Sequence, residues 1–382
     1  MNIAASRIDS RPSIDGGRSN HPPTQSEVRV GLETDFDYCS AEFRGLYESS
    51  GATAFQHPVW LKVFYSILVP GRNARALTLV GRDVNGGRLR FVLPLVERRK
   101  LAVRLVETAD LGVGDYACPI VDRHWHLPQG LADLVAAALP RHDVLRIRPI
   151  REEAVNDWTV FISAPAARTD FSAHATALLP SYPDWRVNAL SKGFTRYLDR
   201  KKRRLLKSGR VELRRLDEPA ALREAIGRMK TLRAGRFEGD PIQTEAVERF
   251  YKEIAVGGAD AGLAQTYVLS IDDQSVGCVF GLTRKGRFHY LLIGCDYDRF
   301  GRHSPGLVMY DMIIERWIQE GGESFDFTIG DEPFKADFGA VPTAMYEIEK
   351  AGTAVGRLAL AAFRLRRRLR ARGTAKEGRQ NR

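Results

Sequence analysis

The feature that most constrains the fold is the order of short elements in the C-terminal third of the chain. Residues 288–293 alternate with the period of a half-buried strand. Ser304 and Pro305 then stand where the N-cap and the first residue of a helix belong. An apolar stripe over 307–318 predicts the body of that helix, and 325–329 predicts the next strand. The pattern therefore predicts a strand, a loop, a capped helix and a second strand in close succession.

The loop in front of this helix is basic and contains glycine. Its predicted contact residues are Arg299, Gly301, Arg302, Ser304 and Gly306. Free N–H groups at a helix start, the positive end of the helix dipole and two arginines together suit a pyrophosphate. A solvated basic loop in an ordinary strand-to-helix connection is an alternative of equal weight. The pattern thus indicates a candidate phosphate site.

Composition indicates a folded protein whose charge is unevenly distributed. The chain has 382 residues, 44% of them hydrophobic, which predicts two domains. Residues 192–215 and 357–382 each carry a net charge of +9, so the rest of the chain carries −7 out of a total of +11. This distribution argues against a broadly cationic nucleic-acid binder. Without an apolar run of membrane length or a secretory signal, we expect a cytoplasmic protein.

The cysteines predict neither a metal site nor a disulfide framework. The chain has four, and they are widely scattered. We therefore expect no metal. Cys295, beside the basic loop, could act as a nucleophile, but a buried apolar role is the favoured interpretation.

Four segments are expected along the chain. Residues 1–30 lack apolar periodicity and predict a disordered tail. Residues 31–182 form the first folded half, and 183–352 form the second. Residues 353–382 predict a basic amphipathic helix and tail. Both halves run hairpin, strand, helix, strand, so a structural duplication is favoured over one domain with an unrelated partner.

Within the first half, the sequence predicts a hairpin and three further elements. The hairpin strands are 76–80 and 89–96, joined by a glycine-containing turn. Residues 115–121 and 144–149 predict strands, and 130–139 predicts a helix.

Several motifs resemble a known family of acyltransferases. The C-terminal half is similar to CelD-like members of the GNAT acetyltransferase superfamily, associated with cellulose and exopolysaccharide biosynthesis. The matching residues are Cys295-Asp296-Tyr297, Ser304-Pro305-Gly306, Asp326-Phe327, Gly330 and Phe334-Lys335. The N-terminal run 55–60 resembles the first signature of the same group, and 334–339 is similar to a turn of the related Fem-type peptidyltransferases. The resemblance spans about residues 50 to 345.

The resemblance implies a fold, a reaction and a set of ligands. The fold is α/β (α+β), with tandem GNAT-like domains that each have a mixed, mainly antiparallel sheet flanked by helices. The reaction is transfer of an acyl group from acetyl-CoA or another acyl-CoA to an amine or hydroxyl. The implied acceptor is an amino sugar or a polysaccharide or cell-envelope precursor.

The resemblance also implies positions for the site residues. Lys335 would stabilise charge at the reacting acyl centre or on a nearby phosphate, with Phe334 beside it in the same turn. The general base is predicted from the residues themselves: Asp326 is preferred because it lies within the predicted strand, and His289, Asp331 and Glu332 nearby are alternatives. The backbone of the strand before the basic loop would lie along the donor arm, which involves Leu292, Ile293, Gly294 and Cys295.

One departure from the superfamily keeps other functions open. The usual coenzyme A pattern, a glutamine or arginine followed by two spaced glycines, is missing, and Arg299, Gly301 and Gly306 are an irregular substitute. A Fem-type transferase that uses aminoacyl-tRNA is one alternative. A non-catalytic subunit of a polysaccharide synthesis complex is another.

Two basic helices could contact anionic partners. Residues 192–207 carry cations at three- and four-residue spacing, which suits a phosphorylated acceptor, an anionic sugar or a tRNA backbone as well as a solvated face. In the C-terminal segment, Leu358, Ala362, Leu365 and Leu369 share one face, and arginines surround it. That helix could lie on the anionic inner face of a membrane or pack on the domain.

Overall fold

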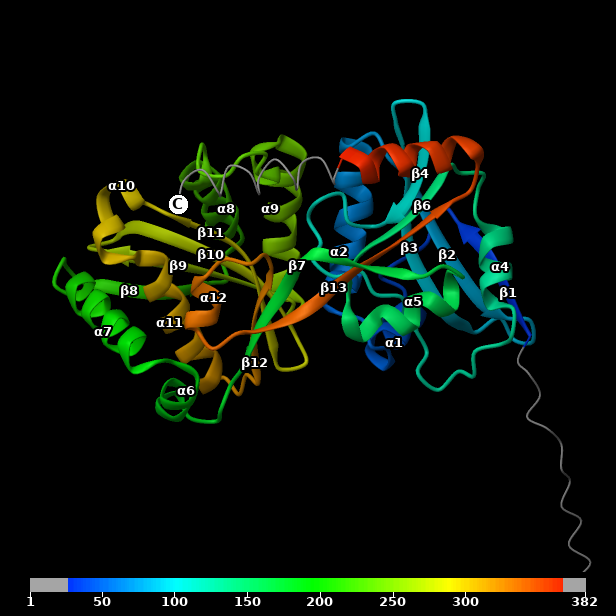
Figure 1. The fold of residues 1–382 in the computed structure, drawn as a ribbon. Coiled ribbons are helices and arrows are strands. Elements are labelled where there is room, and N and C mark those ends of the chain that lie inside the picture. Colours follow the sequence, from blue (N-terminus) through cyan, green and yellow to red (C-terminus); the bar gives the residue numbers. More distant parts are fainter. Residues whose placement is uncertain (1–26, 367–382) are drawn as a thin grey trace, which may run out of the picture.

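The computed structural model describes residues 27–366, which form one thirteen-stranded sheet with helices on both faces (Figure 1). The strands are β1 (Val28–Glu33), β2 (Arg75–Asp83), β3 (Leu89–Lys100), β4 (Val103–Thr108), β5 (Ile120–Val121), β6 (Val144–Arg151), β7 (Ala166–Ala177), β8 (Val211–Leu216), β9 (Ala264–Ile271), β10 (Gln274–Arg284), β11 (Arg287–Cys295), β12 (Ser324–Ile329) and β13 (Val341–Ala351).

The α-helices are α1 (Ala41–Ser49), α2 (Pro58–Val63), α3 (Val69–Gly71), α4 (Leu131–Ala138), α5 (Val155–Phe161), α6 (Tyr182–Ala189), α7 (Lys192–Leu206), α8 (Pro219–Arg233), α9 (Glu245–Asp260), α10 (Tyr297–Phe300), α11 (Pro305–Gln319) and α12 (Phe334–Asp337). Shorter segments are η1 (Ala54–Gln56), η2 (Phe64–Leu68), η3 (Glu152–Ala154), η4 (Pro241–Gln243) and η5 (Gly301–His303). Residues 354–366 are also helical.

The two halves of the sheet repeat one topology. The strand order is β1-β2-β3-β4-β6-β13-β7-β12-β11-β10-β9-β8, with β5 paired to β3. Read from the two edges inward, β1 to β4 correspond to β8 to β11, and β6 corresponds to β12. In each half the fourth strand continues through a connection containing a helix to a parallel neighbour, β6 or β12. The expected duplication is therefore visible in the order of the elements.

The halves exchange their last strands at the centre of the sheet. β7, from the first half of the chain, pairs with β12 of the second half. β13, from the second half, pairs with β6 of the first half and also with β7. Figure 1 shows these two long strands crossing between the halves. Each half is thus completed by a strand from the other, which joins the two into one sheet.

The hydrophobic core, like the sheet, contains residues from both halves of the chain. One buried cluster contains side chains from α1 and α2 together with α8 and α9. Trp60 of α2 and Phe250 of α9 are in edge contact at 4.9 Å between ring centroids, and both are fully buried. A second cluster lies under α11 in the second half, and a third lies under α4 and α5 in the first. Because one cluster spans both halves, their relative position is held by buried apolar surface.

Two local predictions are corrected by the structure. Residues 115–119 are not a strand, since only Ile120 and Val121 pair with β3. Ser304 precedes Pro305 as predicted but has a φ of 51°, and its side chain caps no N–H group of α11. The Ser304 hydroxyl instead lies 2.9 Å from the hydroxyl of Tyr197. Tertiary contacts outweighed local preference at both places.

The predicted hairpin forms β2 and β3, and the predicted helix at 130–139 is α4. Within residues 27–366, no helix combines the length and apolar character that crossing a bilayer requires. The expected tail at 1–30 lies almost entirely outside the described residues, as does the C-terminal segment after residue 366.

Candidate active site between the two halves

The candidate site begins where the parallel strands β11 and β12 separate. They pair only from Arg287 with Ser324 to His289 with Asp326. Beyond that point β11 carries an extra residue, Leu291, which produces a bulge against β10. The Thr328 hydroxyl donates to the Tyr290 carbonyl across the start of the gap, at 3.0 Å. A cleft between diverging parallel strands is a common place for a ligand in α/β sheets.

The equivalent gap in the first half is filled. There β4 and β6 pair over three residues and then separate, but the loop that contains Tyr116 and Ala117 lies across the opening. The Ala117 N–H donates to the carbonyl of Pro149, and the Trp158 indole donates to the Ala117 carbonyl. A cavity of about 20 Å³ remains. The gap of the first half therefore has no room for a ligand the size of an acyl-CoA.

The same loop carries two polar side chains toward the second half. Its shape depends on Asp110, whose Oδ1 accepts hydrogen bonds from the N–H groups of Gly112 and Gly114 at 3.1 and 3.0 Å. Gly112 has a φ of 86°, a conformation that favours glycine. This loop places Asp115 and Tyr116 at the border between the halves.

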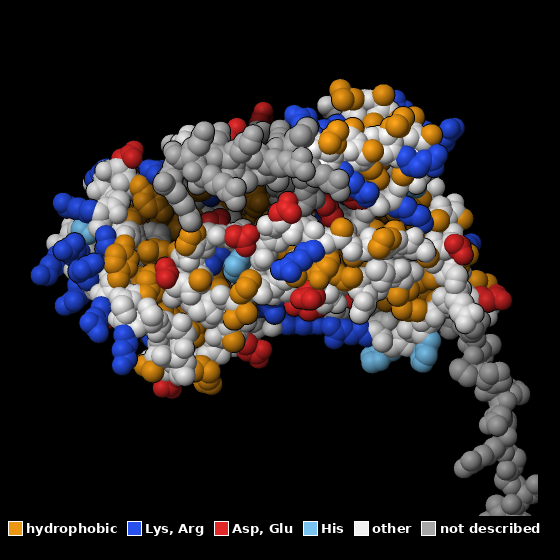
Figure 2. Space-filling model, viewed as in Figure 1, with side chains coloured by type: hydrophobic (Ala, Val, Ile, Leu, Met, Phe, Trp, Pro, Cys, Tyr) orange, Lys and Arg blue, Asp and Glu red, His pale blue; other side chains and the backbone are white. Residues whose placement is uncertain are grey.

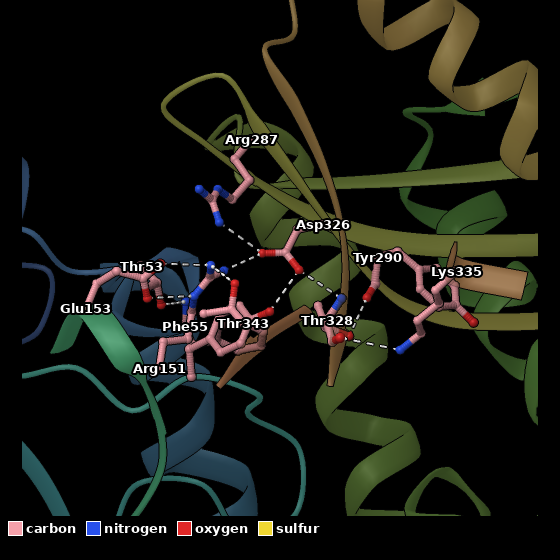
Figure 3. A network of polar contacts seen from close by, with 11 residues as sticks. Thr53, Phe55, Arg151, Glu153, Arg287, Tyr290, Asp326, Thr328, Lys335 and Thr343 are labelled. Atoms are coloured by element: carbon pink, nitrogen blue, oxygen red, sulfur yellow. Dashed lines mark hydrogen bonds and ion pairs between the residues drawn. The ribbon is translucent and has the colours of Figure 1, made fainter. Parts of the chain in front are cut away.

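A buried carboxylate joins the two halves at this border (Figure 3). Asp326 of β12 is fully buried and accepts from Arg151 Nη1 at 2.8 Å and Arg287 Nη1 at 3.1 Å. The Tyr116 hydroxyl and the Thr328 N–H each donate to its Oδ1 at 2.8 Å. Asp326 thus has four donors, two of them from the first half of the chain.

These contacts argue against the predicted role of Asp326 as general base. Burial alone would raise the pKa of its carboxyl, but His289, Arg151 and Arg287 together hold that pKa below the ordinary value. A carboxylate with a lowered pKa and four donors is a poor proton acceptor near neutral pH. Asp326 instead positions Tyr116, Arg151 and Arg287.

His289, one of the alternatives, lies next to this network. It is 3% exposed, its Nδ1 has no hydrogen-bond partner, and its ring contacts Phe55 and Tyr116 edge-on. Burial lowers the pKa of His289 to about 4, so the ring is neutral at pH 7. Among the described residues Nδ1 thus has an unsatisfied hydrogen-bonding capacity, but the atom itself is buried and the ring meets the groove with its other atoms.

Asp115 is a carboxylate that the sequence analysis did not select. It is partly exposed and lies within interaction range of Thr328 and Lys335, at the start of the gap between β11 and β12. Burial raises the pKa of Asp115 to about 7, while Asp110 and Asp326 add to the increase. Such a pKa suits a general base near neutral pH. Only the folded loop reveals it, because no motif surrounds Asp115.

Lys335 does not occupy the predicted position in an open cleft. It is 2% exposed, and its Nζ donates to the carbonyls of Ile329 and Gly330 at 2.9 Å and lies 3.3 Å from that of Thr328. Glu332 adds an ion pair at 2.9 Å. In Figure 3 the ammonium points to this backbone, on the side of Thr328 away from Asp326. With its donors engaged, Lys335 holds the end of β12 in place.

Phe334, the other predicted residue of this turn, belongs to an aromatic cluster. Its ring is stacked on that of Tyr310 at 5.4 Å and contacts Phe327 edge-on at 5.8 Å. Tyr290 also contacts Tyr310, at 5.0 Å. Tyr290, Leu291 and Phe334 are all partly exposed, so apolar surface is accessible along the gap. Phe334 thus contributes packing and apolar surface and no reactive group.

The predicted donor strand is mostly covered by helices. Leu292, Ile293 and Cys295 are at most 9% exposed, and a Cβ at Gly294 would lie 3.0 Å from the Met229 carbonyl of α8. The Ile293 carbonyl already accepts from Arg233 at 2.9 Å. Burial raises the pKa of the Cys295 thiol to about 12, which removes it as a nucleophile.

The predicted phosphate loop lies at the start of α11. Tyr297 covers the first turn, since a Cβ at Gly306 would lie 2.7 Å from its hydroxyl. Arg236 stacks on the Tyr297 ring at 4.6 Å. Tyr297 is 37% exposed, so it is a side chain that an incoming phosphate would meet. Gly301 shows no such constraint, because its nearest neighbour would be 3.8 Å from a Cβ.

Cations surround this loop. Arg299 Nη2 donates to Gln274 at 2.9 Å, and Arg302 is exposed with its Nε 2.9 Å from the His303 ring. Burial and the charges of Arg302, Lys201 and Arg204 lower the pKa of His303. Lys201 and Arg204 come from α7, so the predicted basic helix contributes to the same positive region. Figure 2 shows many Lys and Arg side chains at this left edge of the molecule.

A basic groove of about 380 Å³ opens beside Asp326. It is formed by both halves, and its lining includes Tyr116, Arg151, Arg287 and His289. Within the described part of the chain, no cluster of His, Cys, Asp or Glu has the arrangement of a metal site.

Comparisons with known proteins agree with this architecture. A model of the acetyltransferase (GNAT) domain matches residues 192–336. No curated protein matches the chain. A crystal structure of FemX is similar with a TM-score of 0.55 and 11% identity, and the match covers 81% of this chain and 94% of that one.

Two further solved structures share the fold. A conserved protein of unknown function from Bacteroides thetaiotaomicron has a TM-score of 0.53 and 10% identity, with 83% of this chain and 98% of that chain covered. L-PGS from Bacillus licheniformis has a TM-score of 0.50 and 12% identity, covering 88% and 97%. At these identities the similarity concerns the fold alone. The predicted α/β fold of two similar halves is confirmed by the repeated strand order, and residues 192–336 match a model of the GNAT acetyltransferase domain.

Proposed function

We propose that this protein is an acyltransferase that binds an acyl-CoA at the gap between β11 and β12. The acyl group would be transferred to an amine or hydroxyl of an acceptor bound in the groove between the halves. The observation that carries the proposal is the separation of β11 and β12 beside a polar cluster from both halves. Cations at the start of α11 and partly exposed apolar surface along the gap support a donor with phosphates and an apolar arm.

The proposed reaction assigns the proton transfer to Asp115. The acceptor nitrogen or oxygen attacks the thioester carbonyl carbon, a new C–N or C–O bond forms, and the C–S bond breaks. The acceptor proton passes to the Asp115 carboxylate, and coenzyme A leaves as the thiolate. His289 lines the groove beside this cluster and stays neutral at pH 7. Asp326 keeps the surrounding arginines and Tyr116 in position.

The acceptor class remains a proposal based on resemblance. The run 55–60, which resembles a signature of the CelD-like group, contacts Tyr116: Gln56 Nε2 donates to the Tyr116 carbonyl at 2.8 Å, and Phe55 contacts the Tyr116 ring. This placement supports an acceptor of the kind associated with that group, an amino sugar or a polysaccharide or envelope precursor.

Thermal denaturation with acyl-CoA tests the donor. We expect acetyl-CoA or a longer acyl-CoA to raise the Tm of the full chain, and Arg302→Ala to reduce that increase. Loss of one charge-assisted contact should weaken binding about tenfold. Arg99→Ala, an exposed arginine on the β3–β4 hairpin, is the matched control and should behave as wild type. Unchanged melting with every acyl-CoA would contradict the proposed donor.

A second candidate is transfer from an aminoacyl-tRNA. It is favoured by the position of α7, whose exposed arginines, together with Lys207 just after the helix, continue the positive region of the α11 loop: Arg196, Arg200, Arg203 and Arg204. A polyanion that delivers its acyl group to the same gap could bind there. Salt-dependent binding of charged tRNA, without stabilisation by acyl-CoA, would favour this candidate.

A further inference from the structure

The groove between the halves contains more positive than negative charge. Its lining includes five cationic side chains and two carboxylates: Arg123, Arg151, Arg284, Lys285, Arg287, Glu153 and Asp157. The groove lies against His289 and Tyr116 and therefore next to the proposed acyl centre. It is distinct from the basic loop at the start of α11, which lies beyond the opposite end of β11.

Chain geometry forces three of these cations together. Arg284-Lys285-Gly286-Arg287 forms the tight turn between β10 and β11, with φ values of 45° at Lys285 and 71° at Gly286. Arg284 and Arg287 are direct cross-strand partners. Like charges directly opposite in a sheet are unfavourable. Glu48 and Asp326 compensate Arg284 and Arg287, and among the described residues Lys285 at the tip has no ion pair.

The internal partners leave part of this charge available. Arg284 pairs with Glu48 at 2.8 Å. Within the described part of the chain, Lys285 Nζ donates only to the backbone carbonyls of Glu48 and Ser50, at 3.5 and 3.2 Å. Arg123 is exposed and has no ion pair within 4 Å among residues 27–366. Burial raises the pKa of the Asp157 carboxyl in the same groove, and the charge of Arg123 acts to lower it. Burial and the charges of Arg284 and Arg123 lower the pKa of Lys285, as expected where cations crowd.

We propose that this groove binds the acceptor through a phosphate or diphosphate group, with Lys285 and Arg123 as its principal contacts. The inference rests on the proposed function, because it places the anionic group of the acceptor beside the acyl centre. A compact group with two or more negative charges matches several cations gathered at one hairpin tip.

Calorimetric titration of the full chain with inorganic pyrophosphate at constant ionic strength tests the inference. The combined variant Arg123→Gln and Lys285→Gln should bind pyrophosphate at least about tenfold more weakly, the factor expected for one lost charge-assisted contact. Arg99→Gln with Lys100→Gln, two exposed cations on the β3–β4 hairpin, should bind as wild type. Malonate, a dicarboxylate, should bind more weakly than pyrophosphate.

Two further measurements distinguish anion binding in the groove from binding at the basic loop before α11. Arg302→Gln should leave pyrophosphate binding in place, and acetyl-CoA should still stabilise the Arg123 and Lys285 variant. The inference is overturned if the Arg123→Gln and Lys285→Gln variant binds pyrophosphate with unchanged affinity, or if Arg302→Gln abolishes pyrophosphate binding. It is also overturned if malonate binds as tightly as pyrophosphate. If pyrophosphate binds as expected but no acyl-CoA stabilises the protein, the proposed donor fails while the anion site stands.

Discussion

Two carboxylates at the border between the halves have opposite environments. Asp326 has two arginines, a tyrosine hydroxyl and a backbone N–H as donors, so its charged form is favoured. Burial favours the neutral form of Asp115, and the nearby negative charges of Asp110 and Asp326 favour it further. Such a separation of pKa values often distinguishes a structural carboxylate from one that exchanges protons.

Asp115→Asn tests the assignment of the base. With the pKa of Asp115 at about 7, the wild-type rate should rise as pH increases through 7 and then level off, because the carboxylate must be deprotonated to accept a proton. The variant should lose roughly 10²- to 10⁴-fold in kcat and should lose this pH dependence. Asp337→Asn, an exposed acid of α12, is the control. A retained rise near pH 7 in Asp115→Asn would assign the proton transfer to another group.

The same pKa shift predicts a change in stability. The folded state of Asp115 binds a proton more tightly than the unfolded chain, so this group lowers stability as pH rises from about 4 to 7. Asp115→Asn should therefore increase Tm at pH 8 relative to wild type more than it does at pH 5.

The helical segment 354–366 combines an anchored side with an exposed apolar side. Leu360 is 9% exposed and packs with Leu105 and Val144. Leu358 and Leu365 are 74% and 59% exposed, and Figure 2 shows hydrophobic side chains along this helix at the upper right. One face therefore packs on the domain, and the exposed leucines of the other face are the basis for proposing contact with a membrane surface.

Vesicle binding tests the free face. Leu358→Glu with Leu365→Glu should reduce binding to vesicles that contain phosphatidylglycerol, because burying each of these exposed leucines in the bilayer would contribute about 1.5–3 kcal/mol. Val187→Glu, an exposed apolar residue of α6, is the matched control. Sedimentation with vesicles measures the bound fraction, and equal binding of both variants would remove the membrane proposal.

Across the entire fold, the exchange of β7 and β13 makes the halves interdependent. The exchange places Arg151, at the end of β6, beside Asp326 of β12, and the buried cluster around Trp60 and Phe250 spans the same border. Site and stability are therefore coupled, because the residues that position the groove also hold the two halves together.

Asp326→Ala tests this coupling. Removing the carboxylate leaves buried Arg151 without its principal partner, which should lower the free energy of unfolding by about 3–5 kcal/mol. Asp273→Ala breaks the exposed pair with Arg210 and should cost less than about 1 kcal/mol. Urea denaturation measures both, and a similar small cost for the two variants would show that the network does not hold the halves together.

Local sequence patterns were sufficient to predict the strand–loop–helix–strand order of 288–329, the hairpin of β2 and β3 and the tandem architecture. These depend on side-chain periodicity and turn residues, which are read over a few positions. Lys335 and Asp326 lay in recognisable motifs, yet folding surrounded them with partners that sequence spacing does not reveal. Asp115, the unpartnered nitrogen of His289 and the basic groove emerged only in three dimensions, because burial and charge there come from residues more than a hundred positions apart.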